Sequence, residues 1–241
     1  MAKDIIESDK ENIKNGRENL IDYTSRDLTQ HHSGVLLTRT DFKQANRLCE
    51  NLLSAAEKFA AMAFLYGAKY PEKALDKAWR QVLCAQHHDS ITGTNNEISF
   101  VDLMIEYREA AQTAADVLLR SAKYIASLAK VNDRANTLFV FNPASTDSKG
   151  ICRFDLPEKF SGKYAVITDT NGREYPVHID GRKAFFLAGK IPATGYSLYR
   201  LEERAEDPDP VSVGSDLTIE NKKLRLTVDG KHGGIISVYD K

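Results

Sequence analysis

The stretch that decides the fold runs from residue 42 to residue 64 and has the sequence FKQANRLCENLLSAAEKFAAMAF. Its apolar side chains recur every three or four residues, which places them on one face of an α-helix. This stripe consists of Phe42, Ala45, Leu48, Cys49, Leu52, Leu53, Ala56, Phe59, Ala60, Ala63 and Phe64. We therefore expect a long helix that is capped by Thr40 and ended by Gly67.

Two more helical patterns follow within residues 38–131. The first is short and includes Trp79, which we expect in the core and not on the surface as a sugar-stacking platform. The second opens on Thr94-Asn95-Asn96-Glu97, which has the form of a capping box with Thr94 as the N-cap. Its apolar face is predicted to comprise Ile98, Val101, Met104 or Ile105, Leu118, Ala122, Ile125 and Leu128. Helices of this kind pack as a three-helix bundle.

From Asn136 the periodicity changes to that of short strands. Turn signals such as Asn171-Gly172 and Asp180-Gly181 separate the apolar segments. We expect an antiparallel β-sandwich over residues 136–203 and a linker over residues 204–216. Residues 217–241 are predicted to begin a truncated C-terminal β domain or to supply strands that complete the sandwich. The predicted fold class is thus an α+β multidomain fragment, with a three-helix bundle followed by an antiparallel β-sandwich domain.

The composition excludes several classes of function. The 241 residues carry a formal net charge of −1, so no basic field favours a nucleic-acid partner. No run of about 18 apolar residues is present, and we expect no membrane span. The N-terminus has no apolar core of a signal peptide. Cys49, Cys84 and Cys152 form no Cys-x-x-Cys pair, which argues against a zinc knuckle or a disulfide framework.

The densest group of chemically active residues is Gln86-His87-His88-Asp89-Ser90-Ile91-Thr92-Gly93-Thr94. Imidazole and carboxylate groups suit Zn²⁺, and a loop between two helices is a common place for function. A polar interhelical loop with surface histidines would have the same sequence. One histidine with one aspartate also falls short of the ligand count of zinc, although the pair His31-His32 could join them. From the residues alone both interpretations remain open.

Several segments resemble the class II α-mannosidases of glycoside hydrolase family 38. The resemblance covers residues 30–241 and follows the family's order. The matching segments are His32 to Val35, Thr38 to Arg47, Tyr70-Pro71 to Trp79, Gln86 to Thr94, Phe139 to Pro143, Ile191 to Tyr196, and Glu220 to Lys241. The chain would accordingly be the middle piece of such an enzyme, with residues 1–37 as a tail or a remnant of the upstream barrel.

The resemblance implies a zinc-dependent, retaining exo-α-mannosidase that acts on α-mannosides or mannose-containing glycans. His88 would be a zinc ligand, Asp89 would contact the sugar, and His87 would be a neighbour in the substrate pocket. His87-x-Asp89 and His178-x-Asp180 have the spacing of the family's His-x-Asp zinc motif, but neither is followed by its Pro-Gly-Trp. No segment matches the nucleophile or the acid/base, so no catalytic carboxylate is assigned within this chain.

The partners implied are therefore the glycan, an N-terminal catalytic barrel and a C-terminal β domain of the parent enzyme. We expect the chain alone to be inactive and to bind Zn²⁺ weakly or not at all. The alternative is a non-catalytic carbohydrate-binding or structural module. The compartment stays open: related enzymes are lysosomal, Golgi or bacterial, and the absence of Asn-x-Ser/Thr sequons favours a bacterial source.

Overall fold

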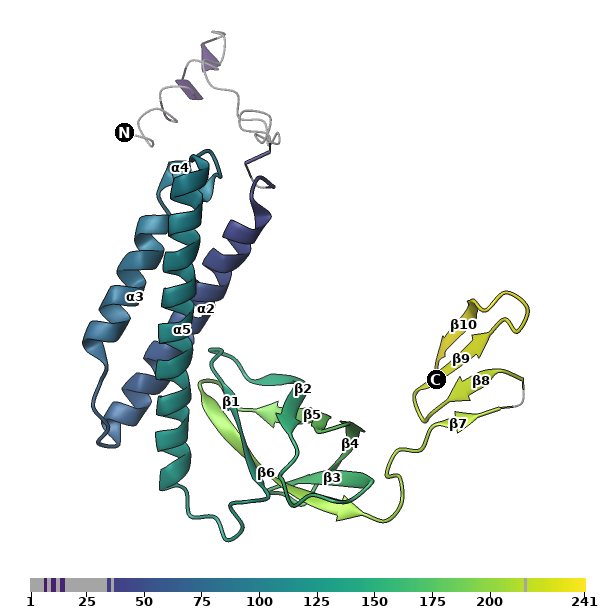
Figure 1. Cartoon of the computed structure of the whole chain (residues 1–241). Helices are drawn as coiled ribbons and strands as arrows, with labels where there is room; N and C mark the ends of the chain where they lie inside the picture. Colours follow the sequence, from purple (N-terminus) through teal and green to yellow (C-terminus); the bar gives the residue numbers. More distant parts are fainter. Residues whose placement is uncertain (1–6, 8–9, 12–13, 16–33, 36, 215) are drawn as a thin grey trace.

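The computed structural model describes residues 7, 10, 11, 14, 15, 34, 35, 37–214 and 216–241 (Figure 1). His31-His32 and most of the predicted tail at residues 1–37 lie outside the described residues. Helices come first and strands follow, which confirms the α+β class. None of the described helices combines the length and the apolar composition that a membrane crossing requires.

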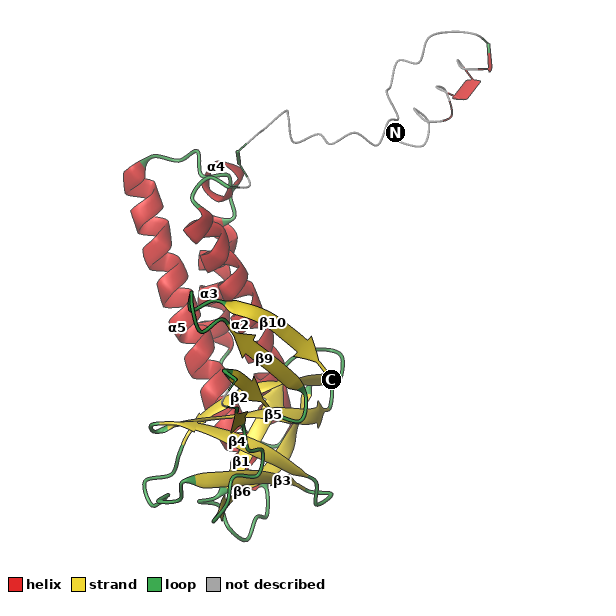
Figure 2. Cartoon of the chain, turned by 90° about the vertical axis from the view of Figure 1, so that its right-hand side faces the viewer, coloured by secondary structure: helices red, strands yellow, loops and turns green. Residues whose placement is uncertain are grey.

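The helical part comprises α2 (Thr40–Leu65), α3 (Glu72–Ala85), α4 (His88–Ile91) and α5 (Glu97–Leu128). The long helices α2, α3 and α5 lie side by side, and the single-turn helix α4 sits at one end of them (Figures 1 and 2). Their shared core is centred on the predicted stripe of α2. Its largest fully buried members are Tyr107, Phe42, Leu53, Val82 and Cys49. Trp79 packs against this core, as expected.

The two predicted N-caps are wrong by one and by two residues. The N-cap of α2 is Arg39, and the Thr40 hydroxyl instead donates to the carbonyl oxygen of Leu37 at 2.8 Å. The N-cap of α5 is Asn96, whose side-chain oxygen accepts from the Ser99 amide at 2.8 Å. The Thr94 hydroxyl is turned the other way and donates to the carbonyl oxygen of Asp89. Asparagine is at least as good an N-cap as threonine, so α5 starts later.

The predicted apolar face of α5 is right at Met104 and Leu118, which pack against the core, and wrong at other first-half positions and at Leu128, which is 48% exposed. Ile98, Val101 and Ile105 are exposed, and the buried face runs instead through Tyr107, Ala110 and other small residues. Alanines let α2 approach α5 closely, so the contact is made where the side chains are small. Ile125, in the second half, is buried as predicted.

The strands that follow form one six-stranded sheet in the order β1-β6-β3-β4-β5-β2. All of its ladders are antiparallel. The strands are β1 (Thr137–Asn142), β2 (Ser148–Asp155), β3 (Tyr164–Asp169), β4 (Glu174–Asp180), β5 (Lys183–Ile191) and β6 (Gly195–Arg204). The sheet curls around a core that includes Ile167, Phe186 and Tyr199 (Figure 2). Each strand falls on an apolar segment predicted from the sequence.

The sheet is joined to the helices by a separate cluster of apolar residues. Phe59 of α2 meets Phe141 of β1 edge to face, with ring centroids 5.3 Å apart. Ala63, Ile125 and Tyr196 belong to the same cluster. This contact lies far from α4, because the cluster packs at the opposite end of the helices (Figure 1).

A four-stranded sheet ends the chain, in the order β10-β9-β8-β7. Its strands are β7 (Ser212–Val213), β8 (Thr218–Glu220), β9 (Leu224–Val228) and β10 (Ile235–Asp240). One face is apolar, because Val213 pairs with Ile219, Ile219 with Leu226, and Leu226 with Val238. The opposite face carries the ion pair of Glu220 with Arg225. The short strand β7 lies within the segment predicted as a linker.

Candidate metal and substrate site

The histidine pair lies in the segment that connects α3 to α5. Helix α3 ends at Ala85 with Gln86 as its C-cap, and His87 is the N-cap of the single turn α4. His87 has an extended backbone conformation (φ −50°, ψ 140°), whereas His88 and Asp89 are helical. We name residues 86–97 the site loop. It stands at the end of the long helices that lies away from the six-stranded sheet (Figure 1), and the side chains of His88 and Asp89 are exposed.

The three predicted site residues are brought together. One ligand atom from each of His87, His88 and Asp89 can be chosen so that all lie within 4.8 Å of one another. The ring centroids of His87 and His88 lie 4.2 Å apart, and His88 Nε2 is 3.5 Å from Asp89 Oδ2. Imidazole nitrogens with a carboxylate oxygen are a donor set that fits Zn²⁺. The side chains of His88 and Asp89 are 80% and 66% exposed, so this face is open to further ligands.

Two threonine hydroxyls hold the backbone of α4 from its C-terminal side. The Thr92 hydroxyl donates to the carbonyl oxygen of His88 at 2.5 Å, and the Thr94 hydroxyl donates to that of Asp89 at 3.0 Å. The two hydroxyl oxygens lie 3.1 Å apart. Gly93 between them has φ +82°, which glycine adopts without strain. The chain therefore makes a tight turn here between α4 and α5.

A polar network fastens the start of the site loop to α2. The Gln86 amide donates to Asn46 Oδ1 and to Glu50 Oε1, both at 2.9 Å. The hydroxyl of Tyr107 donates to the same Asn46 oxygen at 3.0 Å. Burial raises the pKa of Tyr107 well above its ordinary value, so its hydroxyl stays protonated as a donor. Gln86 therefore fixes the direction in which the chain leaves α3.

Arg39 fastens the other end of the site loop. Its guanidinium lies 4.2 Å from the centroid of the Phe100 ring, and NH2 donates to the carbonyl oxygen of Asn95 at 3.2 Å. The same NH2 group lies 3.2 Å from Glu97 Oε2. The sequence gives no role to Arg39, Asn46 or Asn95. Their only signal is that Arg39 and Asn46 fall within a segment that resembles the family.

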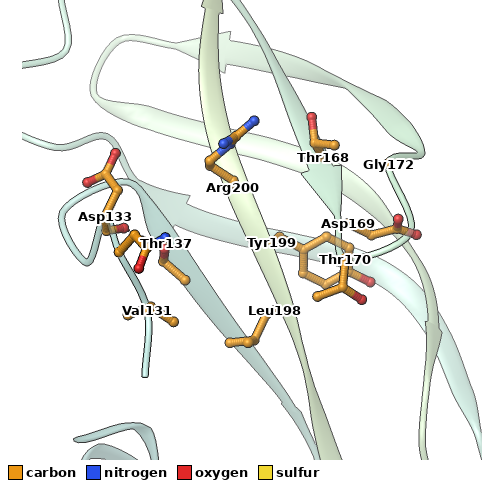
Figure 3. A pocket seen from close by; sticks show the side chains of 11 residues that line it. Val131, Asp133, Thr137, Thr168, Asp169, Thr170, Gly172, Leu198, Tyr199 and Arg200 are labelled. Atoms are coloured by element: carbon orange, nitrogen blue, oxygen red, sulfur yellow. Dashed lines mark hydrogen bonds between the residues drawn. The ribbon is translucent and has the colours of Figure 1, made fainter. Parts of the chain in front are cut away.

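A separate hollow of about 430 Å³ lies against the six-stranded sheet, away from the histidines. Its lining comes from β1, β3, β6 and the segment before β1 (Figure 3). The charged groups there already have partners: Arg200 pairs with Glu202, Asp133 accepts from Asn136, and Asp169 accepts from the Tyr175 hydroxyl. Among the described residues, the group of three possible metal ligands lies in the site loop and not in this hollow, so the site loop is the better candidate.

Comparison with known proteins places the site loop in a recognised domain. Residues 30–125 match the family model described as the alpha mannosidase middle domain. Alpha-mannosidase G of Dictyostelium discoideum is 26% identical over 107 residues, which are 44% of this chain and 10% of that protein. Alpha-mannosidase 2C1 of Mus musculus is 32% identical over 93 residues, which are 38% of this chain and 9% of that protein. The chain thus spans about a tenth of the length of the curated relatives it matches.

Solved structures share the fold over most of the chain. The crystal structure of an alpha-mannosidase from Enterococcus faecalis V583 matches with a TM-score of 0.57, covering 86% of this chain and 28% of that one. A protein in glycosyl hydrolase family 38 from Enterococcus faecalis matches with a TM-score of 0.58, covering 98% of this chain and 32% of that one. Both are 15% identical in sequence, so the likeness is one of fold.

Proposed function

We propose that this chain is the middle part of a family 38 glycoside hydrolase and completes the active site of a zinc-dependent α-mannosidase, a proposal supported by the match of residues 30–125 to the alpha mannosidase middle domain. The observation that carries the proposal is the meeting of His87, His88 and Asp89 on the open end of the helices. That group lies inside the matched segment, on a loop that is held to α2 at both ends.

Each site residue is proposed to have a distinct role. His88 provides an imidazole nitrogen to the metal, which is the role that the resemblance to the family implies for it and one that neutral imidazole suits. Asp89 accepts hydrogen bonds from sugar hydroxyls, because an ionised carboxylate is an acceptor only. His87 lines the substrate pocket beside them, with its ring tilted by 38° against that of His88. Bound Zn²⁺ would act as a Lewis acid and as an anchor for sugar hydroxyls.

The remaining parts of the reaction are proposed to come from elsewhere in a longer enzyme. A retaining glycosidase needs two carboxylates, one as nucleophile and one as acid/base. The relatives are about ten times the length of the segment they share with this chain, which leaves room for a catalytic barrel. This chain would then contribute binding and orientation and would be inactive alone.

The domain boundaries belong to the same proposal. Residues 38–131 would be the three-helix middle domain, since α2, α3 and α5 share one core. Residues 136–203 would be a separate β domain, with one curled six-stranded sheet in place of the two sheets of the expected sandwich, and residues 217–241 would start a larger C-terminal β domain. The uncovered apolar face of the four-stranded sheet supports this last assignment, because such a face is normally packed against another layer.

A hybrid enzyme tests the proposal. The segment of the mouse alpha-mannosidase that aligns with this chain is replaced by residues 30–125, and hydrolysis of a chromogenic α-mannoside is measured. We expect the hybrid to be active, His88→Ala to abolish activity together with bound zinc, and Asp89→Asn to raise KM. Lys77→Ala is the control, because Lys77 is exposed on α3, outside the site loop, and pairs with Glu109.

If the full segment does not fold in the hybrid, residues 86–97 alone are exchanged. This smaller exchange keeps the host helices and moves only the site loop. Activity that survives His88→Ala in either hybrid would reject the proposed role of this residue. Activity of the isolated chain would reject the proposal that the catalytic carboxylates lie outside it.

A further inference from the structure

We propose that Arg39 is a positioning residue for His88 and Asp89, which it serves by anchoring the far end of the site loop to the start of α2. This role rests on the proposed function, because it presumes that His88 binds the metal and that Asp89 binds the sugar. Arg39 touches neither site residue. It acts through Asn95 and the threonines of the loop.

The backbone of Arg39 has an unfavourable conformation, which contacts of its side chain must stabilise. Arg39 has φ 50° and ψ 58°, in the left-handed region that residues other than glycine rarely occupy. Such strain persists only where the surroundings over-determine it. Here the guanidinium stacks on Phe100 and donates to Asn95, and the side chain is only 22% exposed. By contrast, the surface arginine Arg80 is 78% exposed beside its partner Asp76.

Hydrogen bonds lead from Arg39 back to the site residues. Arg39 donates to the carbonyl oxygen of Asn95, and the neighbouring Thr94 donates to the carbonyl oxygen of Asp89. Thr92, 3.1 Å from Thr94 between hydroxyl oxygens, donates to the carbonyl oxygen of His88. Helix α4 is a single turn, and a single turn is not stable without outside contacts. The orientation of the His88 and Asp89 side chains therefore depends on the position of the turn that carries Thr92 and Thr94.

Close packing beside Arg39 supports the same anchor. A Cβ atom on Gly93 would lie 2.9 Å from Thr38 Cγ2 and 3.2 Å from the carbonyl oxygen of Thr38. Thr38 is the neighbour of Arg39, and Lys43 of α2 also donates to its carbonyl oxygen. The turn of the site loop thus rests directly on the start of α2. Gln86 fixes the first end of the site loop through hydrogen bonds to Asn46 and Glu50, and Arg39 fixes the second end.

Site-resolved amide hydrogen exchange on the metal-free 241-residue chain tests this inference. Arg39→Met keeps an unbranched apolar stem over Phe100 and removes the donors. We expect the amides of Ser90, Ile91 and Gly93, which bond within the turn, to exchange at least tenfold faster. The amide of Leu53 in the helical core should not change. Arg39→Lys, which keeps one donor for Asn95, should restore part of the protection.

The matched control is Arg80→Met, which breaks an arginine–carboxylate pair on α3 outside the site loop. Unchanged exchange in the turn of Arg39→Met would overturn the inference. Equal acceleration in the turn and at Leu53 would overturn it as well, because Arg39 would then stabilise the whole helical part. The measurement uses neither metal nor sugar, so an inactive hybrid enzyme would reject the proposed function without deciding this result. In an active hybrid, Arg39→Met should lower kcat at unchanged thermal stability.

Discussion

At the scale of single residues, the turn of the site loop depends most directly on Gly93. Its φ of +82° and its approach to Thr38 leave no room for a side chain. Gly93→Ala should cost about 1–2 kcal/mol for the backbone and about 1–3 kcal/mol more for the contact with Thr38. Urea unfolding followed by the helical circular dichroism signal measures the sum.

Gly67→Ala is the control for this prediction. Gly67 also has a positive φ, of +101°, and ends α2 in the same helical part. A Cβ atom there would meet only the hydroxyl of Tyr124, at an ordinary 3.4 Å. Gly67→Ala should therefore lower the free energy of unfolding by the backbone contribution alone, about 1–2 kcal/mol. Equal losses in the two variants would contradict the packing of Gly93 on Thr38.

The residues of the candidate site differ in how far the sequence could predict them. His87, His88 and Asp89 are neighbours in the chain, so their meeting requires only a local turn. Arg39 and Asn95 meet across 56 residues of sequence, and that contact follows from how α2 and α5 pack. Periodicity predicts that two helices pack, but it does not predict which polar groups face each other at their ends.

At the scale of elements, the long helices and the strands could be predicted because each has a strong periodic pattern. Helix ends were less predictable, since several capping residues compete for the same turn. Thr94 forms a bond to Asp89, and Asn96 caps α5 in its place. Periodicity alone places Ile98 and Val101 on the buried face of α5, but both are exposed, because the buried face begins only at Tyr107.

In the C-terminal sheet, an ion pair that depends on pH links β8 to β9. Arg225 donates to both carboxylate oxygens of Glu220, at 2.8 and 3.1 Å, and Lys241 pairs with it too. These bonds lower the pKa of Glu220 from 4.5 to about 2. A lowered pKa means that the pairing is fully present above pH 4.5 and is lost as pH falls toward 2.

Carbon-detected NMR titration of the Glu220 carboxyl checks this directly. The midpoint should lie near 2 in the wild-type chain and should rise toward 4.5 in Arg225→Gln, which keeps Lys241 alone. A wild-type midpoint already at the ordinary value would mean that the bonds to Arg225 do not persist in solution.

At the scale of the whole molecule, the uncovered apolar face of the C-terminal sheet should govern how the isolated chain behaves. Val213 and Val238 are 75% and 63% exposed on this face. Exposed apolar patches bind hydrophobic dyes and promote association. Val238→Lys should lower both dye binding and concentration-dependent association, as followed by fluorescence and analytical ultracentrifugation.

Tyr239→Lys is the matched control, because Tyr239 is the next residue of β10 and pairs with Arg225 on the polar face. It is similarly exposed, at 59%. The control should leave association nearly unchanged. If both substitutions act alike, charge alone would explain the effect, and the two faces would not differ.

We propose that this chain carries one part of a zinc site and that the other ligands lie elsewhere in a longer enzyme. Calorimetric titration of the chain with Zn²⁺, beside its His88→Ala variant, tests that claim most directly. We expect weak or absent binding in both, because His88 is the one metal ligand proposed here, with Asp89 and His87 assigned to the sugar, and a lone exposed imidazole does not hold zinc tightly. Tight stoichiometric binding that is lost in His88→Ala would contradict the account, since the chain would then hold a complete metal site of its own.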